Sequence, residues 1–294
     1  MKIVILGGCG YVGSVLVQKL VKKKHKLLVV DTMWFGKNIK PHKNIKIIKA
    51  DIRDLKKISF KGYKAIIHLA NIANDPASEL NPNLSWEVNV LATQEIITMA
   101  INDGIKHFIY SSSGSVYGLK KEKKVTEKLS PYPISVYNKT KMIAERVILS
   151  FKDYLKIHII RPATVCGMSP RMRLDLTVNL LSMQALKKES ITIFGGKQKR
   201  PNIHIQDLTD VMIHFLSKKV PSGIYNAGFE NLSILKIAQI IKKKIPCNLK
   251  IKKIIDIRSY NLDSSKLLKT GFKPKYTIND AILEIKENFL KKKL

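Results

Sequence analysis

The chain has 294 residues, with 53 Lys or Arg against 22 Asp or Glu, so its formal net charge is +31. A chain of this length can bury a core of its own, in one large domain or two joined ones. Hydrophobic residues make up 45% of the sequence, which excludes wholesale disorder. No apolar run reaches the roughly 18 residues that a membrane span needs.

Residues with redox or metal-binding chemistry are few. The three cysteines, Cys9, Cys166 and Cys247, are widely spaced and predict neither a disulfide framework nor a paired metal-binding motif. We therefore expect no metal and a cytoplasmic, reducing environment. Glycines at 7–13 interrupt the first apolar run, so no targeting segment is predicted.

The excess of lysine raises the question of an anionic partner, because basic patches attract phosphate groups and anionic lipids. Lysine-rich runs occur at 22–24, 120–124, 242–244 and 291–293, far apart in the sequence and without interleaved aromatic residues. We expect a solvated surface with no membrane or nucleic-acid partner. Affinity for a polyanion is the alternative.

Six short apolar runs are separated by longer amphipathic segments, at 3–6, 27–30, 45–48, 65–69, 108–110 and 158–160. This alternation predicts an α/β fold of the Rossmann type, a doubly wound parallel sheet with helices on both faces. The rhythm loosens after Arg161 and Pro162. We expect a nucleotide-binding domain at 1–165 and a smaller, interleaved substrate-binding region at 166–294, of which about 201–227 returns to the main sheet.

A glycine-rich turn follows the first predicted strand. Gly7, Gly8, Gly10 and Gly13 satisfy both the GxGxxG and the GxxGxxG spacing before a predicted helix. Such a turn brings bare backbone and free helix N–H groups to a pyrophosphate. Asp31 ends the next predicted strand, where a carboxylate can bind both hydroxyls of a ribose, and no arginine follows it at once. The pattern predicts NAD, and not NADP, as the cofactor.

A tyrosine and a lysine, Tyr137 and Lys141, stand one helical turn apart, after a row of serines at 111–113. A phenol has a pKa near about 10 and is a poor base at neutral pH. An ammonium at about 4 Å, in a medium of effective dielectric about 20, favours the phenolate by about 4 kcal/mol, or roughly three pK units. We therefore expect Lys141 to bring the pKa of Tyr137 close to neutral pH, while a serine hydroxyl holds the same substrate oxygen.

These features resemble the extended short-chain dehydrogenase/reductase family, in particular its NAD-dependent nucleotide-sugar epimerases and dehydratases of the UDP-glucose 4-epimerase-like kind. The resemblance covers nearly the whole chain. It rests on GGCGYVG at 7–13, DIRD at 51–54, HLA at 68–70, NVLAT at 89–93, SSSGSVYG at 111–118, YNKTK at 137–141, RPATVCG at 161–167 and RPNIHIQD at 200–207.

The resemblance implies roles for the residues at matching positions. It assigns catalysis to Ser113, Tyr137 and Lys141. It implies a homodimer built on the helix after Asn89 and on the helix of Tyr137. For the nucleotide-diphosphate sugar it implies contacts from Ser113, Asn179, Arg200 and Arg258. For NAD it implies contacts from Gly7, Gly10, Tyr11, Val12, Gly13, Asp31, Asp51, Ile52, Leu69, Ala70, Asn89 and Lys141.

The implied activity is 4-epimerisation of a nucleotide sugar through a transient 4-keto sugar. Dehydratases of the family carry an Asp and a Glu directly after the catalytic serine or threonine, whereas this chain has Gly114 and Ser115, which disfavours dehydration. A nucleotide-sugar 4-dehydrogenase or reductase is the first alternative. A non-catalytic NAD- or RNA-binding scaffold is the second.

Four further residues have less specific interpretations. His68 and His204 lie in apolar strand patterns and are interpreted as packed structural histidines. Arg171 and Arg173 are interpreted either as a solvated loop pair or as phosphate ligands, because a guanidinium can bind two oxygens at once.

Overall fold

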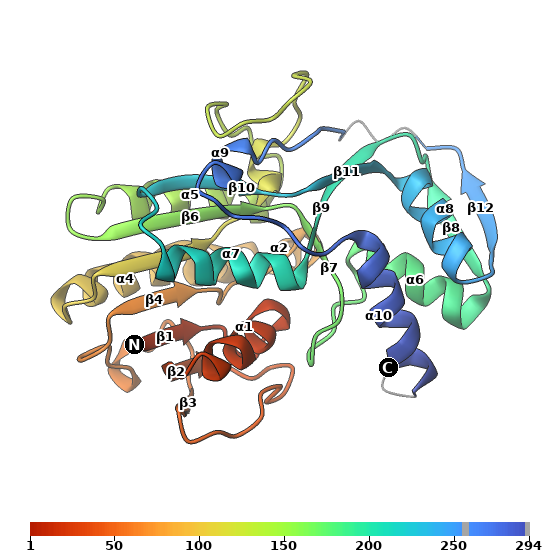
Figure 1. The fold of residues 1–294 in the computed structure, drawn as a ribbon. Coiled ribbons are helices and arrows are strands. Elements are labelled where there is room, and N and C mark those ends of the chain that lie inside the picture. The colour runs from red at the N-terminus through yellow and green to blue at the C-terminus, as the bar shows by residue number, and fades with distance from the viewer. Residues whose placement is uncertain (255–258, 292–294) are drawn as a thin grey trace.

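Seven parallel strands form the central sheet of the computed structural model, which describes residues 1–254 and 259–291. Across the sheet the strands follow the order β10-β6-β5-β4-β1-β2-β3 (Figure 1). This order confirms the predicted doubly wound α/β fold of the Rossmann type. The strands are β1 (Lys2–Leu6), β2 (Lys26–Asp31), β3 (Ile45–Lys49), β4 (Ala65–His68), β5 (His107–Ser111), β6 (Lys156–Pro162) and β10 (Gly223–Ala227).

The last strand of this sheet comes from the second half of the chain. β10 pairs in parallel with β6, with Ile224 opposite Ile159. The segment before it contains α7 (Ile205–Ser217), which packs against α1 (Tyr11–Lys22). Residues from both halves of the chain therefore build the central layers, and the division at residues 165 and 166 stays a prediction.

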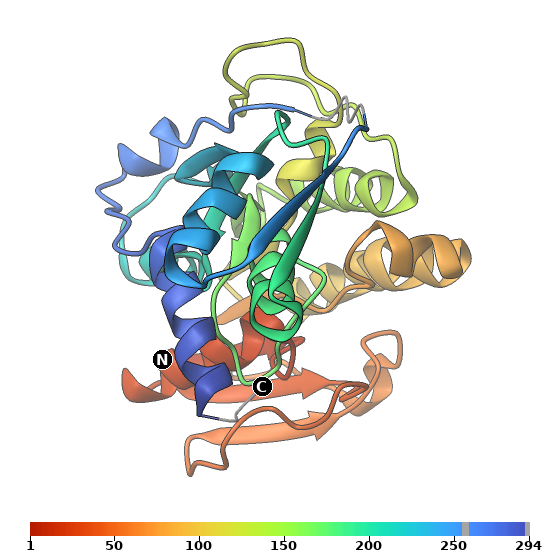
Figure 2. The same ribbon diagram turned by 90° about the vertical axis from the view of Figure 1, so that its right-hand side faces the viewer.

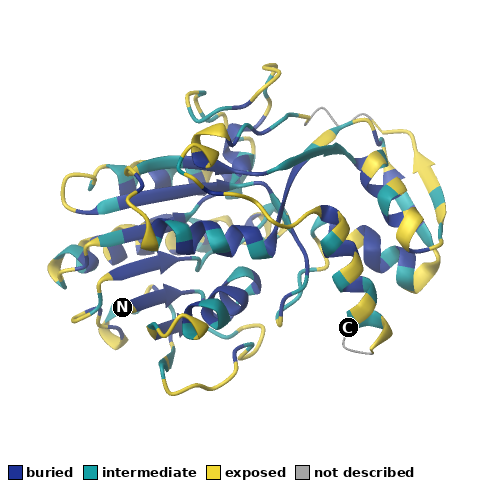
Figure 3. Ribbon diagram, viewed as in Figure 1, coloured by how far each residue is buried: buried dark blue, intermediate teal, exposed yellow. Residues whose placement is uncertain are grey.

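Side chains on each central strand alternate between two hydrophobic cores. On β1, Ile3 and Ile5 pack in the core that contains α1 and α7, whereas Val4 and Leu6 pack in the core of α4 (Ala92–Asn102) and α5 (Val136–Leu149). Both faces of the sheet are therefore covered, and its inner strands are buried along most of their length (Figure 3). This double burial explains the continuous apolar runs of the sequence.

Shorter elements connect the strands. They are η1 (Leu55–Lys57), α2 (Asp75–Leu80), α3 (Pro82–Trp86), the π-helical turn η2 (Glu87–Leu91) and the 3-10 turn η3 (Gly114–Tyr117). Of the helices in the described ranges, none has the length and apolar character needed to cross a bilayer.

A smaller C-terminal lobe has its own hydrophobic core and lies nearest the viewer in Figure 2. It consists of α6 (Thr177–Lys188), β8 (Ser190–Phe194), α8 (Ile234–Lys244), β12 (Asn248–Lys252) and α10 (Ile278–Leu290). A three-stranded sheet of β7 (Thr164–Cys166), β9 (Lys199–His204) and β11 (Glu230–Ser233) lies between the lobe and the central sheet, and α9 (Ser265–Leu268) precedes α10.

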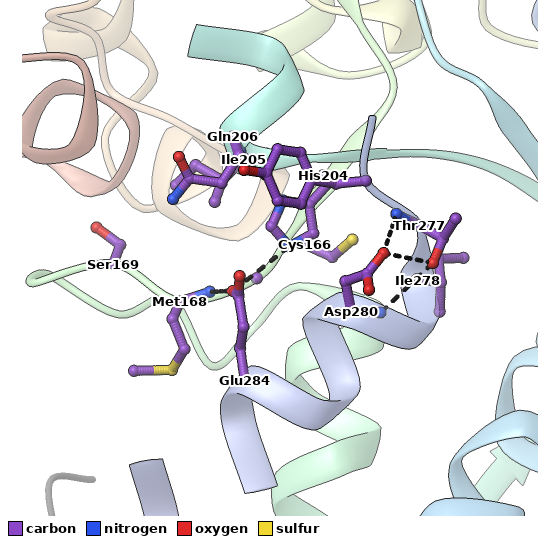
Figure 4. A network of polar contacts seen from close by, with 12 residues as sticks. Cys166, Met168, Ser169, His204, Ile205, Gln206, Thr277, Ile278, Asp280 and Glu284 are labelled. Carbon is purple, nitrogen blue, oxygen red and sulfur yellow. Dashed lines mark hydrogen bonds and ion pairs between the residues drawn. The ribbon is translucent and has the colours of Figure 1, made fainter. Parts of the chain in front are cut away.

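The last helix is tied to the chain that leaves β7 by a polar network around His204 (Figure 4). His204 caps α7, because its Nδ1 accepts a hydrogen bond from the backbone N–H of Gln206 at 3.2 Å. Its Nε2 lies 3.4 Å from the carboxylate of Glu284 on α10, which also accepts from the backbone N–H of Met168 at 3.1 Å. The network fixes the start of the loop that runs from β7 toward α6.

Lysines far apart in the sequence meet on the C-terminal lobe. Lys187 and Lys188 end α6, the lysines at 242–244 end α8, and β8 and β12 begin beside each other directly after these helix ends. Lys250 and Lys252 lie on β12, which is exposed apart from Leu249 (Figure 3). Of the four lysine-rich runs of the sequence, only 242–244 lies in this group, and cations at helix C-termini also have a local electrostatic cause.

Candidate active site

A cleft of about 550 Å³ follows the edge of the central sheet at which the parallel strands end. Ligands of doubly wound sheets bind at this edge. Of the predicted site residues that the structure describes, Asn89, Asn179 and Arg200 do not line the cleft. Arg258 lies outside the described ranges. The predicted site residues that do line it are Gly7, Gly10, Tyr11, Val12, Gly13, Asp31, Asp51, Ile52, Leu69, Ala70, Ser113, Tyr137 and Lys141.

The glycine turn between β1 and α1 has no room for side chains at two positions. Gly7 has φ +82°, and a Cβ built on it would lie 2.5 Å from the backbone nitrogen of Ala70. A Cβ built on Gly13 would lie 2.3 Å from the carbonyl oxygen of Gly7. The chain therefore turns tightly and leaves its backbone bare at the cleft.

The first turn of α1 supplies hydrogen-bond donors to the same place. Gly10 is its N-cap residue and offers no side chain to cap the free N–H groups. A helix N-terminus with unpaired N–H groups binds anions such as a pyrophosphate. This donor set fits the pyrophosphate of NAD.

Asp31 ends β2 beside this turn, and its carboxylate is held in place by two backbone donors. Its Oδ2 accepts from the N–H of Cys9 at 2.9 Å, and its Oδ1 accepts from the N–H of Met33 at 2.7 Å. A carboxylate oxygen has more than one lone pair, so both oxygens can still accept hydrogen bonds from a ligand in the cleft. The position fits the ribose of the cofactor.

Asp51 lies on the same side of the cleft and is held by Arg53. The guanidinium of Arg53 bonds Oδ2 of Asp51 at 2.9 Å and Glu87 at 2.6 Å. Because Arg53 hydrogen-bonds and attracts this carboxylate, the pKa of Asp51 is lowered and the group is an anion at neutral pH. Ile52 follows it as a buried apolar wall.

Asn89 lies behind the cleft and not in its lining. In η2 its side-chain amide donates to the carbonyl oxygen of Ile72 at 3.1 Å and to Thr140 at 3.0 Å, and its Oδ1 accepts from the N–H of Ile72 at 2.8 Å. The side chain thus links the loop after β4 to α5. Its predicted contact with NAD stays a prediction.

The three predicted catalytic residues converge on one part of the cleft. Ser113 follows β5, and Tyr137 and Lys141 lie one turn apart on α5. Nζ of Lys141 donates to the carbonyl oxygen of Ser111 at 2.6 Å and lies 5.8 Å from the centre of the Tyr137 ring. The hydroxyl of Ser113 lies 2.7 Å from that of Ser115.

The expected fall in the pKa of Tyr137 is wrong in this structure. Burial raises the pKa of Tyr137, while the charge of Arg173 and a hydrogen bond with Ser113 oppose that rise. Burial also lowers the pKa of Lys141 to about 7, opposed by Glu145. Desolvation of both groups therefore outweighs the simple attraction between a phenolate and an ammonium.

A buried ion pair behind the serines is one feature that the sequence analysis missed. Nη2 of Arg161 on β6 bonds the carboxylate of Glu145 on α5 at 2.5 Å, and the hydroxyl of Ser112 also donates to this carboxylate. Glu145 stands four residues after Lys141 on the same helix, so the helical spacing could have indicated it. The pair fixes α5 against the strand ends that carry the catalytic residues.

A second missed feature is an ion pair at the other wall of the cleft. Arg173 binds Asp175 through two nitrogen–oxygen contacts of 2.5 Å and 3.1 Å, and Asp175 accepts a further bond from the side chain of Asn74 at 3.0 Å. All three residues line the cleft. The pair places a cation in the same cavity as Tyr137.

Two of the residues predicted for the sugar nucleotide, Asn179 and Arg200, lie in the second half of the chain. Asn179 on α6 is buried, and its amide donates to the hydroxyl of Tyr11 and to the carbonyl oxygen of Arg173, each at 3.0 Å, while its Oδ1 accepts from the N–H of Gly167 at 3.1 Å. Arg200 lies on β9 and donates to the carbonyl oxygen of Lys199 at 3.1 Å. Their contacts with a substrate stay predictions.

Comparison with known proteins places the chain among nucleotide-sugar enzymes. A family model described as the NAD-dependent epimerase/dehydratase family matches residues 3–228. A protein of Bacillus subtilis described as an uncharacterised UDP-glucose epimerase is 32% identical over 262 residues, which cover 82% of this chain and 81% of that protein. A UDP-glucose 4-epimerase of Lactobacillus helveticus is 28% identical and covers 96% of this chain and 95% of its own length.

A solved structure shows the same architecture over almost the whole chain. The UDP-glucose 4-epimerase of Thermotoga maritima, solved with UDP-glucose, superposes with a TM-score of 0.90 at 25% identity and covers 99% of each chain. The matching family model, the glycine turn and the carboxylate beside it agree on the cofactor. The chain belongs to the NAD-dependent epimerase/dehydratase family and is an enzyme of the extended short-chain dehydrogenase/reductase type whose cofactor is NAD.

Proposed function

We propose that the protein is a UDP-hexose 4-epimerase that acts through a transient 4-keto sugar. One observation carries the proposal: Ser113, Tyr137 and Lys141 converge in the same cleft that contains the glycine turn and Asp31. The relatives described as UDP-glucose 4-epimerases suggest the uridine nucleotide.

Tyr137 is the proposed base for the hydroxyl at carbon 4 of the sugar. A phenolate at this position accepts the hydroxyl proton as the carbon–oxygen bond becomes a carbonyl, and the phenol returns the proton when the carbonyl is reduced. Ser113 is the proposed donor of a hydrogen bond to the same oxygen. NAD, when bound, supplies the acceptor for the hydrogen that leaves carbon 4 and the donor that restores it.

Positive charges in the cleft stabilise the phenolate form of Tyr137, which is the form that acts as the base. Because burial raises the pKa of Tyr137, its phenolate needs stabilisation from its surroundings. Arg173 supplies a positive charge from one wall of the cleft, and Lys141 supplies a second from α5 when protonated. The activity should therefore rise with pH until Tyr137 has ionised.

Dehydration finds little support among the acidic residues of the cleft. The positions after Ser113 are Gly114 and Ser115, and Ser115 is hydrogen-bonded to Ser113. Asp75 accepts from the hydroxyl of Ser135 at 2.7 Å, and Asp175 is paired with Arg173. Neither carboxylate is free of a protein partner to act as the extra acid or base of an elimination.

Turnover of a panel of sugar nucleotides tests the proposal. The purified protein is incubated with UDP-glucose, UDP-N-acetylglucosamine and GDP-mannose, and proton NMR follows the hydrogen at carbon 4. Conversion of a UDP-sugar to its 4-epimer without net formation of NADH is the expected result. Stoichiometric NADH instead identifies a 4-dehydrogenase, and no turnover of any sugar nucleotide contradicts the proposal.

The oligomeric state and the cellular location of the protein belong to the same proposal. A homodimer through α4 and α5 and a cytoplasmic location stay predictions. Sedimentation of the purified protein measures the first of them directly.

A further inference from the structure

We propose that Arg171 and Phe35 form a clasp over the cofactor end of the cleft, in which Arg171 binds the pyrophosphate of NAD and its contact with Phe35 slows the release of the cofactor. The guanidinium carbon of Arg171 lies 4.0 Å from the centre of the Phe35 ring, and both residues line the cleft. Phe35 comes from the loop after β2, and Arg171 comes from the loop between β7 and α6. The contact therefore joins the two walls of the cleft.

The guanidinium of Arg171 is free to bind an anion. Within the described part of the chain, no oxygen accepts a hydrogen bond from it and no carboxylate pairs with it. Its neighbour Arg173 contrasts with it, because Asp175 occupies that guanidinium on one side. An arginine carries five N–H donors, and an aromatic ring under its plane leaves their outward edge available.

The loop that carries Arg171 is anchored at the first turn of α1. The hydroxyl of Ser169 donates to the carbonyl oxygen of Tyr11 at 2.7 Å and lies 2.9 Å from the hydroxyl of Ser14. The hydroxyl of Tyr11 donates in turn to the carbonyl oxygen of Gly167 at 2.7 Å. Arg171 stands two residues after Ser169, so it is close to the helix N-terminus that fits a pyrophosphate.

A guanidinium and a helix N-terminus are complementary ligands for two linked phosphates. The helix N–H groups bind one set of oxygens, and the planar guanidinium can bind two more in a charge-assisted pair. Arg171 therefore adds a positive charge to the face of the pyrophosphate that the glycine turn does not reach.

The other half of the clasp is an aromatic pair at the rim of the cleft. Trp34 and Phe35 both line the cleft, yet 60% and 66% of their surfaces are exposed. Their loop is held beside Asp31, whose Oδ1 accepts from the N–H of Met33, and by Asn38, whose side chain donates to the carbonyl oxygen of Cys9 at 3.2 Å. Two rings on this anchored loop, beside the carboxylate of Asp31, can cover a bound cofactor.

The benefit of slow cofactor release rests on the proposed function. An epimerase regenerates its NAD in every cycle, so a cofactor that stays bound is ready for the next sugar. For the cofactor to leave, the contact between Phe35 and Arg171 has to open. The rate of NAD release is therefore the quantity that the clasp controls.

The release of NADH can be measured without any sugar nucleotide, so the test does not depend on epimerisation. The chain has two tryptophans, and Trp86 does not line the cleft, so Trp86→Phe leaves Trp34 as the sole indole. In that background the protein is loaded with NADH and mixed with excess NAD⁺. The loss of energy transfer from Trp34 to the reduced nicotinamide gives the release rate.

Four variants in this background separate the possible roles. Arg171→Ala should speed release about tenfold or more, because it removes a charge-assisted contact, and Arg171→Lys should lie between Arg171→Ala and the parent. Phe35→Ala should speed release about threefold, because it removes the ring under the guanidinium. Lys252→Ala removes a second, remote cation–ring contact, 5.8 Å from Phe194, and should release NADH at the parent rate.

Each result decides the proposal. Faster release in both Arg171→Ala and Phe35→Ala, with Lys252→Ala unchanged, supports the clasp. Rates within twofold of the parent in both variants overturn it. Faster release in Arg171→Ala alone shows an arginine that acts without Phe35, and this outcome also overturns the clasp. In each case the turnover of UDP-sugars is scored separately.

Discussion

Lys141 and Ser111 are joined by a hydrogen bond in which Nζ of Lys141 donates to the carbonyl oxygen of Ser111 at 2.6 Å. The bond fixes the lysine between α5 and the end of β5, 4.7 Å from the centre of the Tyr110 ring. Such burial disfavours the ammonium, and the pKa of Lys141 falls to about 7 from 10.5. The lysine is therefore a cation whose charge is marginal at neutral pH.

We predict that Lys141 makes stability increase with pH above neutrality. Between pH 7 and 10.5 the unfolded lysine binds a proton that the folded one has lost, so the free energy of unfolding rises with pH over this window. Lys141→Met lacks this gain. From pH 7 to pH 9 the wild type should gain about 2 kcal/mol relative to the variant, measured by urea unfolding at both pH values.

The control for Lys141→Met is the same substitution at a lysine that is exposed to solvent. Lys250 on β12 is exposed, so Lys250→Met should change with pH in parallel with the wild type. A constant difference between wild type and Lys141→Met at pH 7 and pH 9 contradicts the lowered pKa.

Tyr137→Phe should abolish turnover while NAD stays bound. The variant keeps the ring and loses only the group that exchanges a proton with the sugar, so kcat should fall by about 10³-fold or more. Tyr132→Phe is the matched control, because Tyr132 is exposed and does not line the cleft. The assay is the NMR conversion of a UDP-sugar, with NAD content measured by absorbance after denaturation. A Tyr137→Phe enzyme within tenfold of wild type removes the residue from its proposed role.

Arg173→Gln should move the alkaline rise of kcat/KM to higher pH. The positive charge of Arg173 lowers the pKa of Tyr137, so its loss raises that pKa and leaves less phenolate at any given pH. At pH 7 the rate should fall on the order of tenfold and recover as the pH rises. The measurement is a pH profile of kcat/KM between pH 6 and pH 10.

Two companion variants separate charge from structure in this profile. Arg173→Lys keeps the charge and should shift the rise less than Arg173→Gln. Lys250→Gln removes a remote surface charge and should leave the profile in place. A fall in rate of the same size at every pH shows that Arg173 only supports the fold.

The central sheet could be predicted because its strands are short, apolar and buried on both faces. All six predicted runs became strands of the central sheet. The C-terminal lobe was harder, since its strand β12 has the short sequence NLKIK, which alternates polar and apolar residues but buries only Leu249 in part, against the core of the lobe. The spatial meeting of lysines on this lobe depends on the pairing of β8 with β12, which sequence distance conceals.

Spacing alone predicts the parts of the site whose residues are close in sequence, whereas distant residues such as Asp51 and Ser113 were assigned through the family resemblance. The glycines lie within residues 7–13, and Tyr137 and Lys141 are four residues apart, so their spacing in the sequence is enough to predict these two parts of the site. The ion pair of Glu145 with Arg161 and the contact of Phe35 with Arg171 depend on how separate segments meet. For the same reason, local motifs did not reveal that the side-chain amides of Asn89 and Asn179 donate hydrogen bonds to other parts of the protein.

The glycine turn gives a last prediction, in which two substitutions separate folding from cofactor binding. Gly13→Ala places a Cβ 2.3 Å from the carbonyl oxygen of Gly7, whereas Gly10→Ala places one 3.4 Å from the same atom at an ordinary φ of −76°. In the absence of NAD, Gly13→Ala should cost about 1–3 kcal/mol of unfolding free energy, and Gly10→Ala should stay close to wild type. Both should weaken NAD binding in calorimetry, since both add a methyl group to the turn. Equal stability losses in the two variants would show that the crowding at Gly13 is relieved by movement of the turn.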